Sequence, residues 1–358
     1  MVQYTARTSL HIWLCLPIAA RCLVSPALRS QTPVTAEDEQ GKLFFLFMAN
    51  DRLLNEDIWA RFFRQGAPSE YVVFLHCQNQ TACAVNVKDK NLYNIVDTVH
   101  SEYCTDLVSP MQALFSAALE QRVQTNIHDK FLILSYNSVP VKPFSAVRNV
   151  LIAGTSSVVQ PVPSNQNQPC GKKTTQWIIL NPDHAQAFVD DNAHLHYWKW
   201  DDICGPEPYG CLDEYYTLAT IFGTRGEGWQ GHLNDLIKEH NVEFRDIMYN
   251  VFSQDHFIGA HALEEANLLS TISSYPNNVA QLSISGTSQG TNSMGPMGPA
   301  EISAVSAKAL TKFRESDHLF LRKIEDTGFA TFKSDHETLS LPDAFQKYVF
   351  DVADEQLF

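Results

Sequence analysis

The sequence of 358 residues predicts an α/β fold whose mostly parallel sheet is flanked by helices. Three apolar runs carry this prediction: Lys42–Met48, Tyr71–His76 and Lys130–Ser135. None of them alternates with polar residues, which is typical of strands buried on both faces of a sheet. A helical pattern separates the first two runs. A strand, a helix and a strand within about 35 residues form a βαβ unit, whose strands are parallel.

The first half of the chain alternates between strand and helix patterns. Asn55–Phe63 has apolar residues at helical spacing, and we expect helices at Asn91–Val99 and Val108–Val123 as well. The strand Lys130–Ser135 ends in the polar turn Tyr136–Pro140. Ligands of open α/β sheets bind at the carboxyl ends of strands. This turn is therefore either part of a ligand site or an ordinary polar turn.

The second half continues the pattern and adds an insertion. A strand is expected at Lys172–Leu180, and helices are expected at Phe144–Leu151, from about Pro182 to Asp190, and at Ala300–Phe313. We expect a helical insertion at about 224–277, with helices at His232–Lys238, Val242–Phe252 and Phe257–Ser270. The main domain covers 42–325, and the tail 326–358 has no pattern that we can assign.

The N-terminal residues resemble a targeting segment. Arg7 precedes the apolar run Leu10–Ala20, and small residues follow. The run is shorter than the roughly 20 residues of a spanning helix. Residues 1–27 are therefore predicted to be either a signal peptide that is cleaved or a signal anchor, in preference to an ordinary mature N-terminus, and 28–41 to be a linker. Both alternatives place the protein in the secretory pathway.

The net charge and the cysteines bear on the possible partners, disulfides and metal sites of the protein. The net charge of -14 argues against a nucleic-acid partner, which needs a basic surface. Cys204 and Cys211 flank a turn-rich loop and are the preferred disulfide pair, although the sequence does not fix the connectivity. No metal site is expected, because no two cysteines have the spacing of a zinc knuckle. Asn79 is a glycosylation acceptor if the chain is luminal.

An acidic pair, Asp213-Glu214, stands at the start of an apolar helical segment. Carboxylates are favourable there because the first turn of a helix carries a partial positive charge. Asp213 is expected to cap this helix. Glu214 is either an exposed residue of the first turn or, at a junction of loop and helix, a general base.

Several blocks of the chain resemble the core-2/I-branching β-1,6-N-acetylglucosaminyltransferase family, including its plant and bacterial relatives. They occur in family order: KLFFLFMAN with IWARFF, YVVFLHC, KFLILSYNSVPVKPF, KKTTQWIIL, CLDEYYTLAT and FRESDHLFLRKIE. The resemblance implies a Rossmann-like GT-A domain that transfers a sugar, GlcNAc or a related one, from a UDP-sugar with inversion. It also implies a type II Golgi membrane protein with a luminal catalytic domain and a glycan or glycoprotein acceptor.

The resemblance also implies roles for individual residues. Glu214 would be the base that deprotonates the acceptor hydroxyl, while Lys323 with Arg322 would neutralise the departing diphosphate. No two aspartates have the D-x-D spacing with which most GT-A enzymes hold a metal, so no metal or other cofactor is expected. The walls of the donor and acceptor pocket would come from Ser135, Asn137, Ser138, Gln176, Trp177 and Asp213.

The chain departs from the family in one charged position. The segment Leu282–Ala300 has no basic residue where the family has one, and Arg225 or Arg314 is a candidate replacement. This departure leaves an alternative open, a family member that has lost catalysis and only binds a sugar or a protein. A hydrolase is disfavoured because the chain has no Walker loop, and because its G-x-S-x-G sequence, Gly286–Gly290, lies in a Gly/Ser/Met/Pro-rich segment and does not open a helix pattern.

Overall fold

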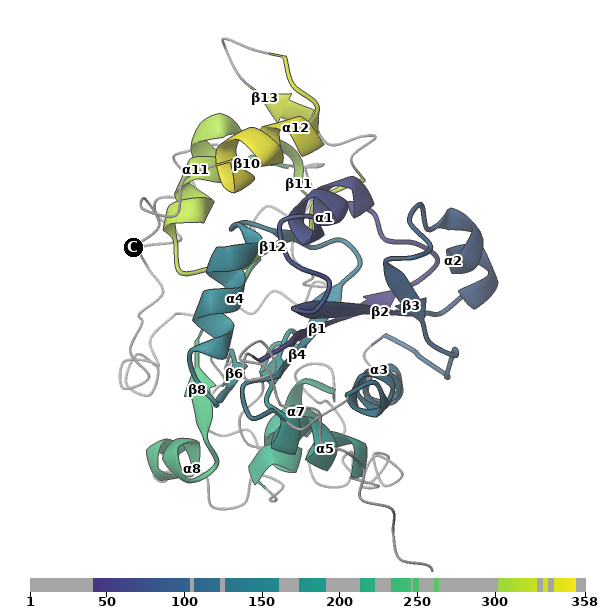
Figure 1. Ribbon diagram of the computed structural model, residues 1–358, viewed down its shortest axis with the longest axis vertical. Coiled ribbons are helices and arrows are strands. Elements are labelled where there is room, and N and C mark those ends of the chain that lie inside the picture. The colour runs from purple at the N-terminus through teal and green to yellow at the C-terminus, as the bar shows by residue number, and fades with distance from the viewer. Residues whose placement is uncertain are drawn as a thin grey trace, which may run out of the picture.

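A computed structural model describes eleven segments of the chain. They are residues 41–103, 106–122, 126–160, 174–190, 213–222, 233–245, 247–250, 261–263, 302–326, 331–333 and 338–351. Within them a seven-stranded sheet has the order β3-β2-β1-β4-β7-β6-β8. Helices cover both of its faces, with α1 and α4 on one side and α3, α5 and α7 on the other (Figure 1). The predicted α/β fold is confirmed.

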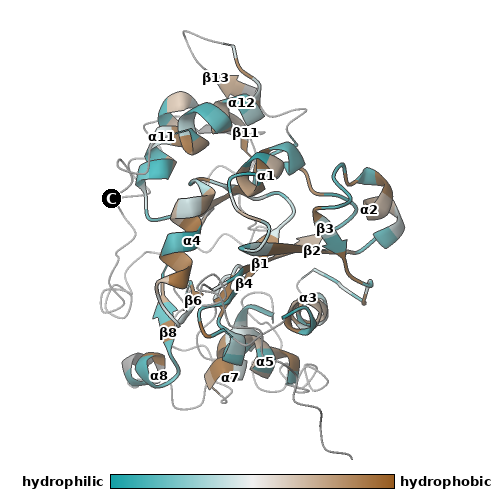
Figure 2. Ribbon diagram, in the orientation of Figure 1, coloured by the Kyte–Doolittle hydropathy of each residue, from teal (hydrophilic) through white to brown (hydrophobic). Residues whose placement is uncertain are grey.

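The three apolar runs form the centre of this sheet. They are β1 (Leu43–Ala49), β2 (Tyr71–Cys77) and β4 (Lys130–Ser135). β1 pairs in parallel with both neighbours along its whole length. The runs lack alternation because helices bury both faces of the strands, and β1 and β2 are correspondingly hydrophobic in Figure 2.

Shorter strands extend the sheet on both sides. β3 (Tyr93–Ile95) is parallel to β2, whereas β7 (Ile179–Leu180) is antiparallel to β4. β6 (Ser157–Val159) is antiparallel to β7, and β8 (Val242–Phe244) is parallel to β6. The sheet is therefore mixed at this end and parallel around β1.

Except for the helix Gln80–Asn86, which the sequence did not predict, the helices of the main domain lie close to their predicted places. They are α1 (Glu56–Phe63), α2 (Gln80–Asn86), α3 (Val108–Glu120), α4 (Phe144–Ile152), α5 (Pro182–Asp190), α7 (Asp213–Phe222) and α8 (Leu233–Glu239). α1 packs its aromatic face on β1. The ring of Phe45 lies 5.0–6.1 Å from the rings of Trp59, Phe62 and Phe63. The apolar spacing that predicted this helix is thus its contact with the core.

The C-terminal elements form a cap beside α1. Two small sheets are found here. One consists of β5 (Val139–Pro140), β12 (Phe320–Arg322) and β9 (Met248–Asn250). The other consists of β10 (His261–Leu263), β11 (Ile302–Ser306) and β13 (Thr331–Lys333). The helices are α11 (Ala307–Glu315) and α12 (Leu341–Phe345), and a π-helical turn, Gln346–Phe350, follows. Leu341, Phe345 and Val349 are buried in the core. The tail that the sequence left unassigned thus packs with the main domain.

Several predicted helices are wrong. Asn91–Val99 contains β3, Val242–Phe252 contains β8 and β9, and Phe257–Ser270 contains β10. The first residues of Ala300–Phe313 form β11, although the rest is helical as expected. Each of these strands is short and pairs with a strand distant in sequence, so pairing outweighs local preference. A short apolar run does not by itself distinguish a strand from a helix.

Part of the predicted organisation lies outside the described segments. This holds for the targeting segment 1–27 and for almost all of the linker 28–41. No helix in the described segments combines the length and the hydropathy that a membrane crossing requires.

Candidate functional site

A cavity of about 310 Å³ lies at the carboxyl ends of the central strands. Its walls are Arg52, Leu54, Tyr136, Asn137, Lys323, Ile324, Glu325 and Asp326. The first two residues follow β1, the next two follow β4 and the others follow β12. Because β1 and β4 are parallel neighbours, their carboxyl ends meet at one edge. This is where open α/β sheets bind ligands.

The turn after β4 is held by its own polar groups. The Ser135 hydroxyl donates to Asn137 Oδ1 at 2.7 Å, and the Ser138 hydroxyl donates to the Ser135 carbonyl at 2.6 Å. Trp59 Nε1 donates to the Ser138 carbonyl at 2.8 Å. Ser135 and Ser138 are buried and shape the turn, whereas Tyr136 and Asn137 face the cavity.

The segment that carries Lys323 is fastened to this turn. The Ile324 backbone N–H donates to the Asn137 carbonyl at 3.0 Å, and Asn55 Nδ2 donates to the Ile324 carbonyl at 3.2 Å. The Lys323 carbonyl accepts from the backbone N–H of Ile302 at 2.7 Å. Lys323 is therefore held beside the carboxyl end of β4, although it is distant from that strand in sequence.

Arg322 contacts an aromatic ring and interacts electrostatically with an acidic residue. Its guanidinium carbon lies 4.4 Å from the centre of the Trp177 ring, a cation–π contact. Burial lowers the pKa of Arg322 to about 10, while Tyr103, Tyr136 and Glu214 act in the opposite direction. Arg322 therefore stays cationic at neutral pH, and the Glu214 carboxylate is close enough to act on it electrostatically.

The two acidic residues at the start of α7 lie in different environments. Asp213 is buried, and its Oδ2 accepts from Gln176 Nε2 at 2.6 Å. Glu214 is only partly buried. Its backbone carbonyl accepts from the Thr174 N–H at 2.8 Å, which joins α7 to the segment that carries Gln176 and Trp177. Glu214 is not among the residues that line the 310 Å³ cavity.

The structure thus brings Arg322 into contact with Trp177, and it places Lys323 in one cavity with Tyr136 and Asn137, whereas Glu214 influences Arg322 only electrostatically. The sequence reading missed Arg52 and Leu54. Both residues follow the first strand of a parallel sheet, and this position could have predicted that they line a ligand site.

Of the two candidates for the missing basic residue, Arg314 does not line this cavity. Arg314 donates from Nη1 to the Tyr348 carbonyl at 3.1 Å, and its own carbonyl accepts from Lys142 Nζ at 2.6 Å. The first contact ties α11 to the C-terminal turn, and the second ties it to the segment between β5 and α4. Arg225 lies outside the described segments.

Three other predictions concern cysteines, glycosylation and metal. Cys204 and Cys211 lie outside the described segments, but Cys77 and Cys83 form a disulfide between the end of β2 and α2. Asn79 is exposed and caps α2, with Oδ1 accepting from the Ala82 N–H at 3.0 Å. In the described part of the chain, no group of three or more histidine, cysteine or acidic side chains is arranged to hold a metal ion.

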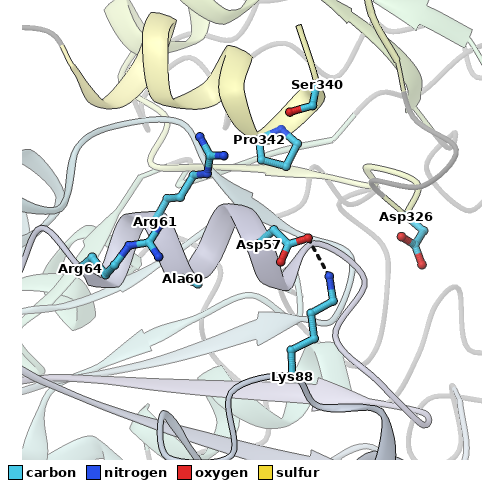
Figure 3. Close-up of a pocket in the computed structure, with 8 residues that line it drawn as sticks. All are labelled: Asp57, Ala60, Arg61, Arg64, Lys88, Asp326, Ser340 and Pro342. Carbon is cyan, nitrogen blue, oxygen red and sulfur yellow. Dashed lines mark hydrogen bonds and ion pairs between the residues drawn. The ribbon is translucent and has the colours of Figure 1, made fainter.

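Figure 3 shows a second cavity, of about 640 Å³. It is lined by Asp57, Ala60, Arg61, Arg64, Lys88, Asp326, Ser340 and Pro342. Asp326 lines both cavities. Two of the cations here are paired, Lys88 with Asp57 at 2.6 Å and Arg61 with Asp343 at 2.6 Å. An anion would have to compete with these ion pairs for Lys88 and Arg61, whereas Arg64 is exposed and forms no ion pair with the described residues.

Comparison with known proteins finds one distant similarity. The chain is 20% identical over 224 residues to Glycosyltransferase BC10 of Oryza sativa subsp. japonica. The aligned region covers 52% of this chain and 54% of that protein, so the chain spans about half the length of the relative it matches. No family model matches the chain. The similarity supports a relationship to glycosyltransferases in general, and it leaves the core-2/I-branching family unconfirmed.

Proposed function

We propose that this protein is an inverting glycosyltransferase that works without a metal. It moves a sugar, GlcNAc or a related one, from a UDP-sugar to a hydroxyl of a glycan or glycoprotein. The observation that carries the proposal is a pair of neighbouring cations, one of which lines a cavity at the ends of the strands while the other is within electrostatic range of an acidic residue. Lys323 lines a cavity at the carboxyl ends of the strands, and Glu214 acts electrostatically on the adjacent, partly buried Arg322.

These residues suit the two charges that develop during transfer. In the proposed reaction Glu214 takes the proton of the acceptor hydroxyl, and the acceptor oxygen forms a bond to the anomeric carbon. The bond from that carbon to the UDP oxygen breaks, and its electron pair stays on the β-phosphate. Arg322 and Lys323 stabilise this negative charge. Trp177 holds the Arg322 guanidinium in position through the cation–π contact.

The proposed setting is the lumen of the secretory pathway, with the protein either anchored in the Golgi membrane or secreted. Disulfides persist in oxidising compartments, and the bond between Cys77 and Cys83 is consistent with that setting. Asn79 is exposed, as a glycosylation acceptor must be.

Titration with UDP in a calorimeter tests the proposal. The wild-type protein is expected to bind UDP, and Lys323→Ala is expected to bind it at least about tenfold more weakly, because a hydrogen bond to a charged group is lost. Lys88→Ala is the control, because this lysine is exposed and paired with Asp57 in the other cavity. A wild-type protein with no affinity for UDP would show that the proposal is wrong.

A catalytically impaired binding protein is the second candidate. Its supporting observation is the formal charge of the cavity, where Arg52 and Lys323 are balanced by Glu325 and Asp326. Release of UDP from UDP-sugars, with and without glycan acceptors, separates the two candidates. UDP binding without turnover of any donor would favour the binding protein.

A further inference from the structure

Arg52 is a cation of the cavity that the sequence resemblance does not assign. It follows β1 and lines the 310 Å³ cavity together with Lys323. Its side chain is exposed, and it forms no hydrogen bond or ion pair with the residues that the structure describes. Arg52 is thus available to a ligand that enters the cavity.

The backbone around Arg52 is fixed on both sides. The Asp51 carbonyl accepts from Asn86 Nδ2 at 3.1 Å. The Leu54 backbone N–H donates to the carbonyl of Tyr136, a cavity residue, at 3.0 Å. Leu53, between them, is buried. The loop therefore presents the Arg52 side chain at the cavity on a backbone that is already ordered, which lowers the entropic cost of binding.

The other charges of the cavity restrict the class of ligand. Two cations, Arg52 and Lys323, share the walls with two carboxylates, Glu325 and Asp326. A ligand that satisfies both kinds of group carries an anionic part and several hydroxyls. A nucleoside diphosphate has this combination, because its phosphates accept from cations and its ribose hydroxyls donate to carboxylates.

We propose that Arg52 is the second cation that binds the diphosphate of the donor, together with Lys323. This assignment rests on the proposed function. It supplies the positive charge that Leu282–Ala300 lacks, from a different part of the chain. The planar guanidinium matches two phosphate oxygens at once, which a lysine ammonium does not.

Calorimetry with three ligands tests this role. Arg52→Ala is expected to weaken binding of UDP by between about 10-fold and 100-fold, which is the range for a lost hydrogen bond to a charged group. Binding of UMP should weaken less, and binding of uridine should not change. Arg52→Lys should recover part of the affinity for UDP. Arg64→Ala is the matched control, because Arg64 is also exposed but lines only the second cavity (Figure 3).

The results separate this role from the proposed function. If the wild-type protein binds UDP, and Arg52→Ala binds it as tightly as Arg64→Ala does, the role of Arg52 is wrong and the proposed function stands. An equal loss of affinity for uridine and UDP would also overturn it, because the contact would then be to the nucleoside. If the wild-type protein does not bind UDP, both assignments fail. The melting temperature of each variant confirms that it is folded.

Discussion

Two carboxylates that are adjacent in sequence take different roles at the start of α7. Asp213 is buried, and its side chain is hydrogen-bonded to Gln176. Glu214 is partly buried and acts on Arg322. The sequence could predict that an acidic pair begins this helix, but it could not show which carboxylate the core encloses, because that depends on Gln176, which is distant in sequence.

Replacing Gln176 with leucine is expected to destabilise the protein. The buried Asp213 carboxylate would lose a hydrogen-bond donor, and the free energy of unfolding should fall by about 1–3 kcal/mol. Urea unfolding followed by tryptophan fluorescence measures this change. Gln186→Leu is the matched control, because Gln186 also donates to an aspartate, Asp190, but at the exposed surface. Equal effects of the two substitutions would contradict the structural role of Gln176.

At the scale of elements, long apolar runs predicted the central strands, whereas short elements depended on tertiary pairing. β1, β2 and β4 are buried along most of their length, so their burial is visible in the sequence. β3 and β8 have three residues each, which is too short for a pattern. The pairing of β12 with β5, which brings Lys323 to the turn after β4, has no local signal either.

The contact between α5 and β6 makes the free energy of unfolding depend on pH. The Asn181 N–H donates to Ser157 Oγ at 2.9 Å, and that hydroxyl lies 2.7 Å from His184 Nδ1. The serine hydroxyl can donate its proton to Nδ1 when that nitrogen is unprotonated. Burial lowers the pKa of His184 to about 4; His240 and Lys130 lower it further, and Asp183 opposes them.

We expect the folded protein to lose stability as the pH falls from about 6.5 to about 4. Over this range the unfolded chain binds a proton at His184 and the folded chain does not. His184→Asn retains an acceptor near Nδ1 and does not titrate, so it should flatten this part of the profile. Urea unfolding at several pH values measures it, with the exposed His100→Asn as the control. A slope that is unchanged in His184→Asn would contradict this account.

At the scale of the whole molecule, the C-terminal segment closes the domain over α1. α12 packs against α1, and its Phe345 is fully buried. An exposed ion pair between Arg61 and Asp343 joins the same two helices. The sequence did not predict this closure, because the segment is short and its partners lie near the other end of the chain.

Phe345→Ala is expected to lower the free energy of unfolding by about 3–5 kcal/mol, because it leaves a cavity in the core. Arg61→Ala should have a much smaller effect, since exposed ion pairs contribute little. Thermal unfolding of the two variants measures the difference. If Arg61→Ala were the more destabilising change, the closure would be electrostatic and this account would be wrong.

The candidate site also depends on the whole molecule. The sequence resemblance indicated Glu214, Arg322, Lys323 and the turn after β4, and the structure fastens the segment of Lys323 to that turn, while Glu214 does not line their cavity. It could not indicate Arg52, whose role follows from a cavity that three separate segments form. The charge balance of that cavity was likewise invisible before the segments were assembled.

The turnover of Glu214→Gln tests the central claim most directly. The measurement is the release of UDP from the donor sugar in the presence of a glycan acceptor, beside calorimetric binding of UDP. Loss of the base is expected to reduce turnover at least about 100-fold, the usual contribution of a general base, while UDP still binds. The exposed Glu239→Gln is the control. Turnover in Glu214→Gln equal to that of the wild-type protein would contradict the claim.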